Sequence, residues 1–214
     1  MDGDPRVDGT GFSYTIDWFS GGIPIWQWLF SEMSEVAKVL EIGSYEGRSA
    51  VWLIENAFKQ GGKGDMYCVD TWEGGVEHDA AAMAAVETRF FHNIALAKSR
   101  SRAHVDVHVL KGTSMSHLAK LLAEGNAGSF DAVHVDGSHQ CADVLSDLVL
   151  SFALLRTGGV MICDDYFWSL EERGREDLLN QPKLAIDSFV NCYRRKLSPK
   201  AINVRQIYLL KTAD

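Results

Sequence analysis

The sequence lacks the features that mark several common classes of protein. Its four cysteines stand far apart without a CxxC pair, which argues against a zinc ribbon or a disulfide framework. No apolar run approaches about 18 residues, and no positively charged leader with an apolar core opens the chain. We therefore expect a cytoplasmic protein without a membrane partner. No repeat or linker divides the 214 residues, so we expect one domain, 1–214, whose residues 1–36 form an aromatic-rich N-terminal extension and helix.

Positive charge is also scarce. The chain has 21 Lys and Arg against 29 Asp and Glu, which gives a formal net charge of −8. Affinity for phosphate backbones comes largely from basic residues, so this balance argues against a general nucleic-acid surface. One local basic cluster, Arg194-Arg195-Lys196, is typical of a solvated helix end. A small-molecule partner is therefore expected, and no nucleic acid.

Strand-like and helical patterns alternate along most of the chain, after a polar opening at residues 1–10 that we expect to be frayed. Strands are predicted at residues 38–42, 66–69, 105–110, 132–135, 160–163 and 206–210. Helices are predicted near residues 24–36, 49–59, 80–98, 116–124, 141–155 and 183–196, with Gly158-Gly159 ending the helix at 141–155 and residues 201–204 in a hairpin with the last strand. This alternation predicts an α/β fold, a Rossmann-like doubly wound three-layer sandwich with a mainly parallel sheet and an antiparallel C-terminal strand.

A glycine loop joins the first predicted strand of this pattern to a helix. The strand ends at Gly43 and the helix starts after Gly47, which leaves free backbone N–H groups for a ligand. Dinucleotide sites use GxGxxG, whose middle glycine lets a pyrophosphate approach, but Tyr45 stands at that position here. A ligand without phosphates fits the loop better, and Glu41 in the strand could accept from its ammonium or from loop N–H groups. The alternative is that the two glycines only make a tight turn.

The next strand ends at Asp70, where an acid can accept two hydrogen bonds from a ribose diol. Trp72 follows, and it could stack on a base or pack in a partly buried loop. The connection after it carries Glu73, Glu77, His78 and Asp79, which suit either a lid over a substrate or an acidic loop that caps the next helix.

Three acids follow two later strands. Asp136 ends one strand, and Asp164 and Asp165 end the next, so the carboxylates can converge at one edge of the sheet. Adjacent carboxylates are costly without a cation, and oxygen ligands without cysteine suit Mg²⁺ or another divalent cation. His139 could then take a proton from a substrate hydroxyl. The alternatives are a capping role for Asp164, a solvated Asp165 and a surface position for His139.

These segments together resemble a known family. Their order is LEIGSYEGRSA, CVDTWEG, KGTS, FDAVHVDGSH and LLRTGGVMICDDYFW. It is similar to the class I S-adenosylmethionine-dependent methyltransferases, and within them to the group with macrolide-sugar O-methyltransferases and cephalosporin-hydroxylase-like proteins. The similarity runs from about Phe12 to Lys211.

The resemblance implies S-adenosylmethionine as the cofactor, a divalent metal, and O-methylation of a small-molecule or sugar-like hydroxyl. It implies a cofactor pocket at Glu41, Gly43, Ser44, Gly47, Asp70, Thr71, Trp72, Thr113, Ser114 and Asp136. It implies a metal at Asp136, Asp164 and Asp165, and a general base at His139. The sequence departs from the family at Thr113, where related proteins often carry an acid near the adenine amino group.

Other functions are less consistent with these residues. A methyltransferase of nucleic-acid bases commonly carries an (Asp/Asn/Ser)-Pro-Pro-aromatic motif where this chain reads Asp136-Gly137-Ser138-His139. A nucleotide-cofactor oxidoreductase would need the missing middle glycine. A non-catalytic module that binds S-adenosylmethionine, and catalysis without metal, stay open. The aromatic residues at 18, 19, 26 and 28 suit core packing, a cover on the acceptor pocket or a dimer contact, so the oligomeric state also stays open.

Overall fold

A seven-stranded sheet forms the centre of the protein. The computed structural model describes residues 6–7, 9–75, 78, 80–172, 174–203 and 205–214. The strand order is β5-β4-β3-β6-β7-β9-β8. The five strands from β5 to β7 are parallel, and β9 runs antiparallel to both of its neighbours. The large sheet consists of β3 (Lys38–Ile42), β4 (Lys63–Asp70), β5 (His104–Lys111), β6 (Phe130–Val135), β7 (Leu155–Cys163), β8 (Leu197–Ile202) and β9 (Ile207–Lys211).

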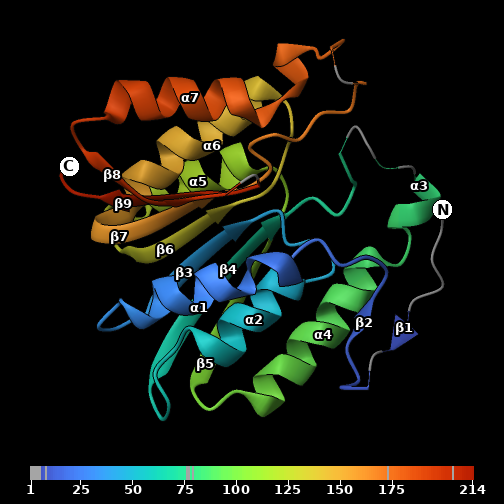
Figure 1. The fold of residues 1–214 in the computed structure, drawn as a ribbon. Helices are drawn as coiled ribbons and strands as arrows, with labels where there is room; N and C mark the ends of the chain where they lie inside the picture. The colour runs from blue at the N-terminus through green and yellow to red at the C-terminus, as the bar shows by residue number, and fades with distance from the viewer. Residues whose placement is uncertain (1–5, 8, 76–77, 79, 173, 204) are drawn as a thin grey trace.

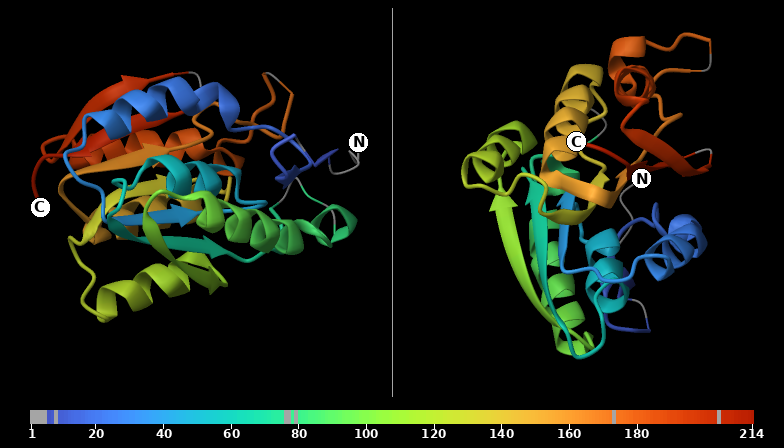
Figure 2. Two further views of the ribbon diagram at one scale, coloured as in Figure 1. Left: turned by 90° about the horizontal axis from the view of Figure 1, so that it is seen from below. Right: turned by 90° about the vertical axis from the view of Figure 1, so that its left-hand side faces the viewer.

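Helices cover both faces of this sheet (Figures 1 and 2). One face packs against α1 (Ile23–Ser31), α2 (Arg48–Asn56) and α4 (Val86–Arg100), through buried residues such as Trp26, Leu53 and Phe90. The other face packs against α5 (Ser114–Ala123), α6 (Cys141–Leu154) and α7 (Pro182–Tyr193). All six residues of β6 are buried, as a central parallel strand covered on both faces requires. The predicted three-layer fold with its mainly parallel sheet and antiparallel C-terminal strand is confirmed.

Several predicted boundaries were wrong. The helix predicted over 80–98 is two helices, α3 (Ala80–Met83) and α4, because Ala85 leaves the helical region with φ −118° and ψ 0°. Gly158-Gly159 does not end α6, since the chain is already extended at Leu155 and both glycines lie within β7. Helix α1 ends at Ser31 rather than near residue 36.

The two ends of the chain also differ from expectation. Residues Arg6–Val7 (β1) pair with Ser13–Tyr14 (β2) in a small antiparallel sheet, although a frayed end was predicted there. Residues 1–5 and 8 of that opening lie outside the described residues. The partner of β9 is β8 at Leu197–Ile202, which begins four residues earlier than predicted, and Val204 lies outside the described part. None of the described helices has the length and apolar character needed to cross a membrane.

Candidate active site

Close contacts with other parts of the protein determine which residues the glycine loop after β3 can contain. Gly43 has φ +83°, and a Cβ added there would lie 1.8 Å from the backbone oxygen of Asp136. Gly47 has φ +81° at the start of α2, and a Cβ there would lie 3.0 Å from the ring of Phe90. Only glycine tolerates both the positive φ and the close approach at the first position. The loop therefore lies directly against the end of β6.

Asp70 holds this loop in place from the end of β4. Its carboxylate accepts hydrogen bonds from the backbone N–H groups of Tyr45 and Trp72, each at 2.7 Å. Both of those residues have positive φ, at 46° and 55°. Burial raises the pKa of Asp70, while these backbone hydrogen bonds act against the rise. A carboxylate has about four lone-pair sites, so Asp70 keeps acceptor capacity for a ligand.

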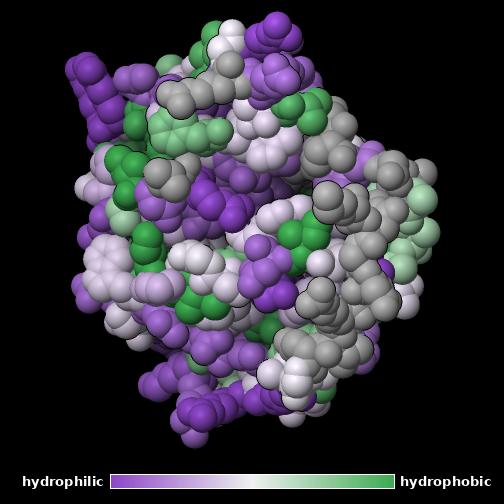
Figure 3. Space-filling view, turned by 45° about the vertical axis from the view of Figure 1, so that its right-hand side comes forward, coloured by the Kyte–Doolittle hydropathy of each residue, from purple (hydrophilic) through white to green (hydrophobic). Residues whose placement is uncertain are grey.

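A cavity of about 600 Å³ opens at the carboxyl ends of the parallel strands, and Figure 3 shows this face with hydrophilic surface across its middle. Ten of the residues predicted for the site line this cavity: Gly43, Ser44, Asp70, Thr71, Thr113, Ser114, Asp136, His139, Asp164 and Asp165. The sequence thus identified much of the part of the wall that the strand ends form, because strand ends of a parallel sheet meet at one edge.

Three residues predicted to bind the cofactor lie outside the cavity wall: Glu41, Gly47 and Trp72. Trp72 is only 5% exposed, its Nε1 donates to the Tyr45 carbonyl at 2.9 Å, and its ring packs on Phe90. This supports the packing interpretation of Trp72 rather than stacking on a base. Glu41 is fully buried, and its Oε1 lies 3.3 Å from Nδ1 of His134.

The acidic strand ends meet as a cluster with a buried histidine. Single ligand atoms of His134, Asp136 and Asp164 lie within 4.8 Å of one another. Burial, followed by repulsion from Asp164 and Asp165, raises the pKa of Asp136 well above its ordinary value. Carboxylates in this arrangement favour a cation or a proton between them. The structure therefore brings together two of the three acids predicted to hold a metal.

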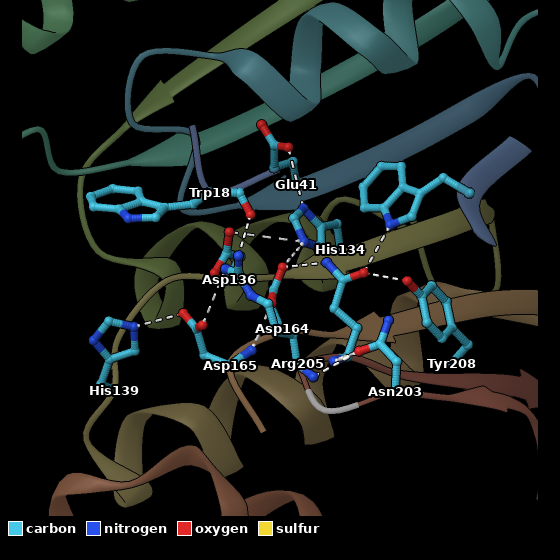
Figure 4. A network of polar contacts seen from close by, with 12 residues as sticks. Trp18, Glu41, His134, Asp136, His139, Asp164, Asp165, Asn203, Arg205 and Tyr208 are labelled. Atoms are coloured by element: carbon cyan, nitrogen blue, oxygen red, sulfur yellow. Dashed lines mark hydrogen bonds and ion pairs between the residues drawn. The ribbon is translucent and has the colours of Figure 1, made fainter. Parts of the chain in front are cut away.

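His134, which the sequence analysis missed, carries the positive charge of this cluster (Figure 4). Its ring nitrogens lie 3.3 Å from Glu41 and 3.3 Å from Asp164. Burial by itself lowers the pKa of His134, but the bonds to Asp164 and Glu41 together raise it to about 10. The two neighbours of β6 explain the contacts, because Glu41 is the register partner of His134 on β3 and β7 follows on the other side.

Gln206, the residue before β9, completes the buried network. Its amide nitrogen donates to Asp164, and its carbonyl oxygen accepts from Trp26 at 3.2 Å and from the Tyr208 hydroxyl. His134 and Gln206 together hold the pKa of Asp164 below its ordinary value, although burial acts in the opposite direction. Asp164 is thus held as a carboxylate.

Asp165 was predicted to bind a metal together with Asp136 and Asp164, but its carboxylate contacts basic side chains instead. Its carboxylate lies 3.0 Å from Nε2 of His139 and 3.6 Å from the guanidinium of Arg205 (Figure 4). The backbone of Asp165 has φ 54°, an unusual value for a residue other than glycine. The His139 ring also stacks on Trp168, with centroids 3.8 Å apart. Asp165 and Trp168 therefore hold the imidazole of His139 at the cavity wall.

The N-terminal segment forms the remaining wall. Tyr14, Ile16, Trp18 and Phe19 line the cavity, and the guanidinium of Arg205 donates to the carbonyl of Trp18. Thr15 donates to the buried Glu46 at 2.7 and 2.9 Å, which ties this segment to the glycine loop. The predicted aromatic residues thus occupy different places. Trp18 lines the cavity, whereas Trp26 is fully buried in the core.

His78 is the described residue of the predicted lid that faces the cavity. Its Nδ1 accepts from the Gly75 N–H at 3.2 Å, and its ring packs beside Tyr45 and Trp18. Glu77 and Asp79 of the same predicted lid lie outside the described residues. The role of this segment as a lid stays a prediction.

The comparisons with known proteins agree with this fold. The sequence profile of a family described as methyltransferase domain matches residues 40–166. The O-methyltransferase TomG of Streptomyces achromogenes, solved with SAM, is similar with a TM-score of 0.64 and 19% identity over 91% of this chain and 82% of TomG. An O-methyltransferase of Bacillus cereus, solved with SAH, gives 0.63 and 18%, with coverage of 91% and 83%.

A third similar structure contains a metal. The methyltransferase MycE of the mycinamycin biosynthetic pathway, solved with Mg and SAH, gives a TM-score of 0.59 and 18% identity. The match covers 92% of this chain but 51% of MycE. No functionally curated protein matches this chain in sequence.

Proposed function

The chain belongs to the methyltransferase-domain family of class I enzymes, and we propose that it is an S-adenosylmethionine-dependent O-methyltransferase acting on a small-molecule hydroxyl. Membership of this family argues against the alternative that the chain is a nucleotide-cofactor oxidoreductase. One observation carries the proposal. The glycine loop, Asp70, the acidic pair Asp136 and Asp164, and His139 all face the same cavity of about 600 Å³. A cofactor site and a proton-accepting group on one cavity are what methyl transfer to a hydroxyl requires.

The cofactor would lie across the strand ends. Asp70 would accept from the ribose hydroxyls, since its carboxylate oxygens retain acceptor sites beside their backbone bonds. Gly43, Ser44 and Thr71 would contact the cofactor from the two loops that Asp70 connects, and Thr113 and Ser114 from the end of β5. S-adenosylmethionine, when bound, supplies an electrophilic methyl group. The chain's own residues must therefore orient the acceptor and remove its proton.

His139 is the proposed general base. Its Nε2 lies 3.0 Å from the carboxylate of Asp165, which stabilises the imidazolium that forms when the ring takes a proton. Stacking on Trp168 fixes the plane of the ring at the cavity wall. The ring thus meets the acceptor with its orientation already set, which is the main contribution that a protein makes to a reaction without a covalent enzyme intermediate.

A divalent cation fits the acidic pair beside this base. Glu41, Asp136 and Asp164 surround His134, so one imidazolium faces three carboxyl groups. Burial, followed by repulsion from Asp164 and Asp165, raises the pKa of Asp136, and a bound cation would oppose that rise. Asp136 and Asp164 would hold the cation through oxygen atoms, as Mg²⁺ prefers. The ion would supply the Lewis acidity that makes an acceptor hydroxyl easier to deprotonate.

Titration of Mn²⁺ into the metal-free protein tests the cation site directly. Electron paramagnetic resonance of free Mn²⁺ measures the binding. We expect one strong site per chain in the wild type and the loss of this site in Asp164→Asn. Asp106→Asn removes the same charge from an exposed position on β5 and should bind Mn²⁺ like the wild type. Equal binding by all three proteins would remove the proposed cation site. Turnover that survives exhaustive EDTA treatment would show that methyl transfer proceeds without metal.

Calorimetric titration of S-adenosylmethionine tests the proposed function as a whole. We expect micromolar binding by the wild type and at least tenfold weaker binding by Asp70→Ala, because two charge-assisted hydrogen bonds to the ribose are lost. The variant also loses its bonds to the glycine loop, so its folding is checked by circular dichroism. Absence of binding by folded wild-type protein would contradict the proposal.

A further inference from the structure

Trp18 is an aromatic side chain that lines the cavity, yet the protein leaves much of it uncovered. It is 47% exposed, and Ile16, two residues earlier on the same segment, is 44% exposed and also lines the cavity. Single apolar side chains on a surface need no explanation, but two of them on the wall of a cavity present apolar surface to the molecule that fills it. The residues proposed above for the cofactor, the cation and proton transfer do not include this surface.

Three contacts hold Trp18 in this place. The guanidinium of Arg205 donates to its carbonyl oxygen, and its indole packs beside the Tyr45 ring with centroids 5.4 Å apart. The preceding residue, Asp17, forms an ion pair of 3.3 Å with Arg48. Arg205 lies just before β9 and Arg48 begins α2, so the segment is tied to two different parts of the cavity wall. The indole is therefore held at the cavity although it is only half covered.

Arg205 also links Trp18 to the proposed general base. Its guanidinium lies 3.6 Å from one carboxylate oxygen of Asp165, whose other oxygen lies 3.0 Å from Nε2 of His139. Figure 4 shows the indole of Trp18 and the imidazole of His139 on the same side of the acidic pair. The base and the exposed indole thus belong to one part of the cavity wall. The acceptor must lie in that part, because its hydroxyl has to reach His139.

We propose that Trp18 binds the acceptor, and that the acceptor is a hydroxyl compound with a flat apolar body, such as a phenol or a naphthol, rather than a sugar. This inference rests on the proposed function. The body of the acceptor would cover the indole of Trp18 and the side chain of Ile16 while its hydroxyl faces His139. An aromatic ring gains buried apolar area and a favourable ring contact with an indole. A sugar would instead place hydroxyl groups against Ile16, which offers them no hydrogen-bond partner.

The test measures how two acceptor analogues bind to protein that is saturated with S-adenosylhomocysteine, by calorimetric titration. 2-Naphthol has a flat apolar body, and methyl α-mannopyranoside is a sugar with a vicinal diol. 2-Naphthol has a single hydroxyl group, so chelation of a cation cannot explain a preference for it. We expect the wild type to bind 2-naphthol at least about tenfold more tightly than the sugar.

Substitutions separate the indole from the rest of the cavity. Trp18→Ala should weaken 2-naphthol binding by at least about tenfold, and Trp18→Phe, which keeps an aromatic ring, by less than about threefold. Trp28→Ala is the matched control, because Trp28 is 43% exposed but lines a different and smaller surface pocket. This control should bind 2-naphthol like the wild type. All three variants should bind S-adenosylhomocysteine with nearly wild-type affinity, because Asp70 is unchanged.

Each failure has its own meaning. If the sugar binds as tightly as 2-naphthol, if neither analogue binds, or if Trp18→Ala binds 2-naphthol like the wild type, the inference is wrong and the proposed function stands. Equal losses in Trp18→Ala and Trp28→Ala would show adsorption to exposed tryptophans and would overturn the inference as well. Failure of the wild type to bind S-adenosylhomocysteine would instead refute the proposed cofactor, and the inference with it.

Discussion

His139→Ala is expected to lower turnover by roughly 100- to 10,000-fold, the range in which a positioned general base contributes. The imidazole lies on the cavity wall with its Nε2 directed at Asp165, so its removal deletes the proton acceptor. Cofactor affinity should stay near the wild-type value, because the glycine loop and Asp70 are untouched. Release of S-adenosylhomocysteine, measured with the first acceptor found in a panel of vicinal diols and phenols, gives the turnover.

Asp165→Asn separates orientation from proton transfer. The amide retains a hydrogen bond to His139 but no longer stabilises the imidazolium, so we expect a smaller fall in turnover than for His139→Ala. Calorimetry with S-adenosylmethionine controls for cofactor binding in both variants. Unchanged turnover in His139→Ala would remove His139 from the mechanism, whatever the effect at Asp165.

Gly43→Ala is expected to cost more than about 4 kcal/mol of the free energy of unfolding, or to prevent folding. The added methyl group would lie 1.8 Å from the Asp136 oxygen and 2.5 Å from the Asp136 carbonyl carbon, both backbone atoms of the end of β6. The strand end that carries Asp136 would have to move. Urea denaturation of the variant measures the cost, and any folded fraction should bind S-adenosylmethionine poorly.

Gly125→Ala is the matched control for this substitution. Gly125 has φ +85°, nearly that of Gly43, but none of the described residues has an atom within 4 Å of the Cβ position. Only the left-handed backbone conformation is then penalised, at about 1–2 kcal/mol. The difference between the two variants isolates the steric contact. If both lost the same stability, the end of β6 would have to be compliant enough to accept a side chain at Gly43.

Local pattern was sufficient to predict the sheet and one wall of the site. Asp70, Asp136 and Asp164 each end a parallel strand, and parallel strands bring such ends to one edge. The loop glycines were visible for a related reason, since a strand that stops and restarts as a helix needs positive φ. The sequence did not show why Gly43 must lack a side chain, however, because the atoms that crowd it belong to Asp136, 93 residues later in the chain.

Residues that act across elements escaped prediction. His134 reads as one more position in a buried strand, and its charge follows only from its neighbours Glu41 and Asp164 on the adjoining strands. Trp72 illustrates the reverse case, because a loop tryptophan suits a ligand platform until the core that buries it is known.

The sequence alone was therefore enough to identify the fold class, the methyltransferase family and the edge of the sheet where chemistry would occur. The fold class and the sheet edge depend on periodicity and on residue types at strand ends, which are local properties of the chain, whereas the family followed from the resemblance of its ordered motifs. Only the tertiary structure decided the partners of each acid: His134 for Asp164, and His139 for Asp165. A carboxylate's partner and its pKa depend on atoms within a few ångströms, and strand order and helix packing bring those atoms from distant parts of the chain.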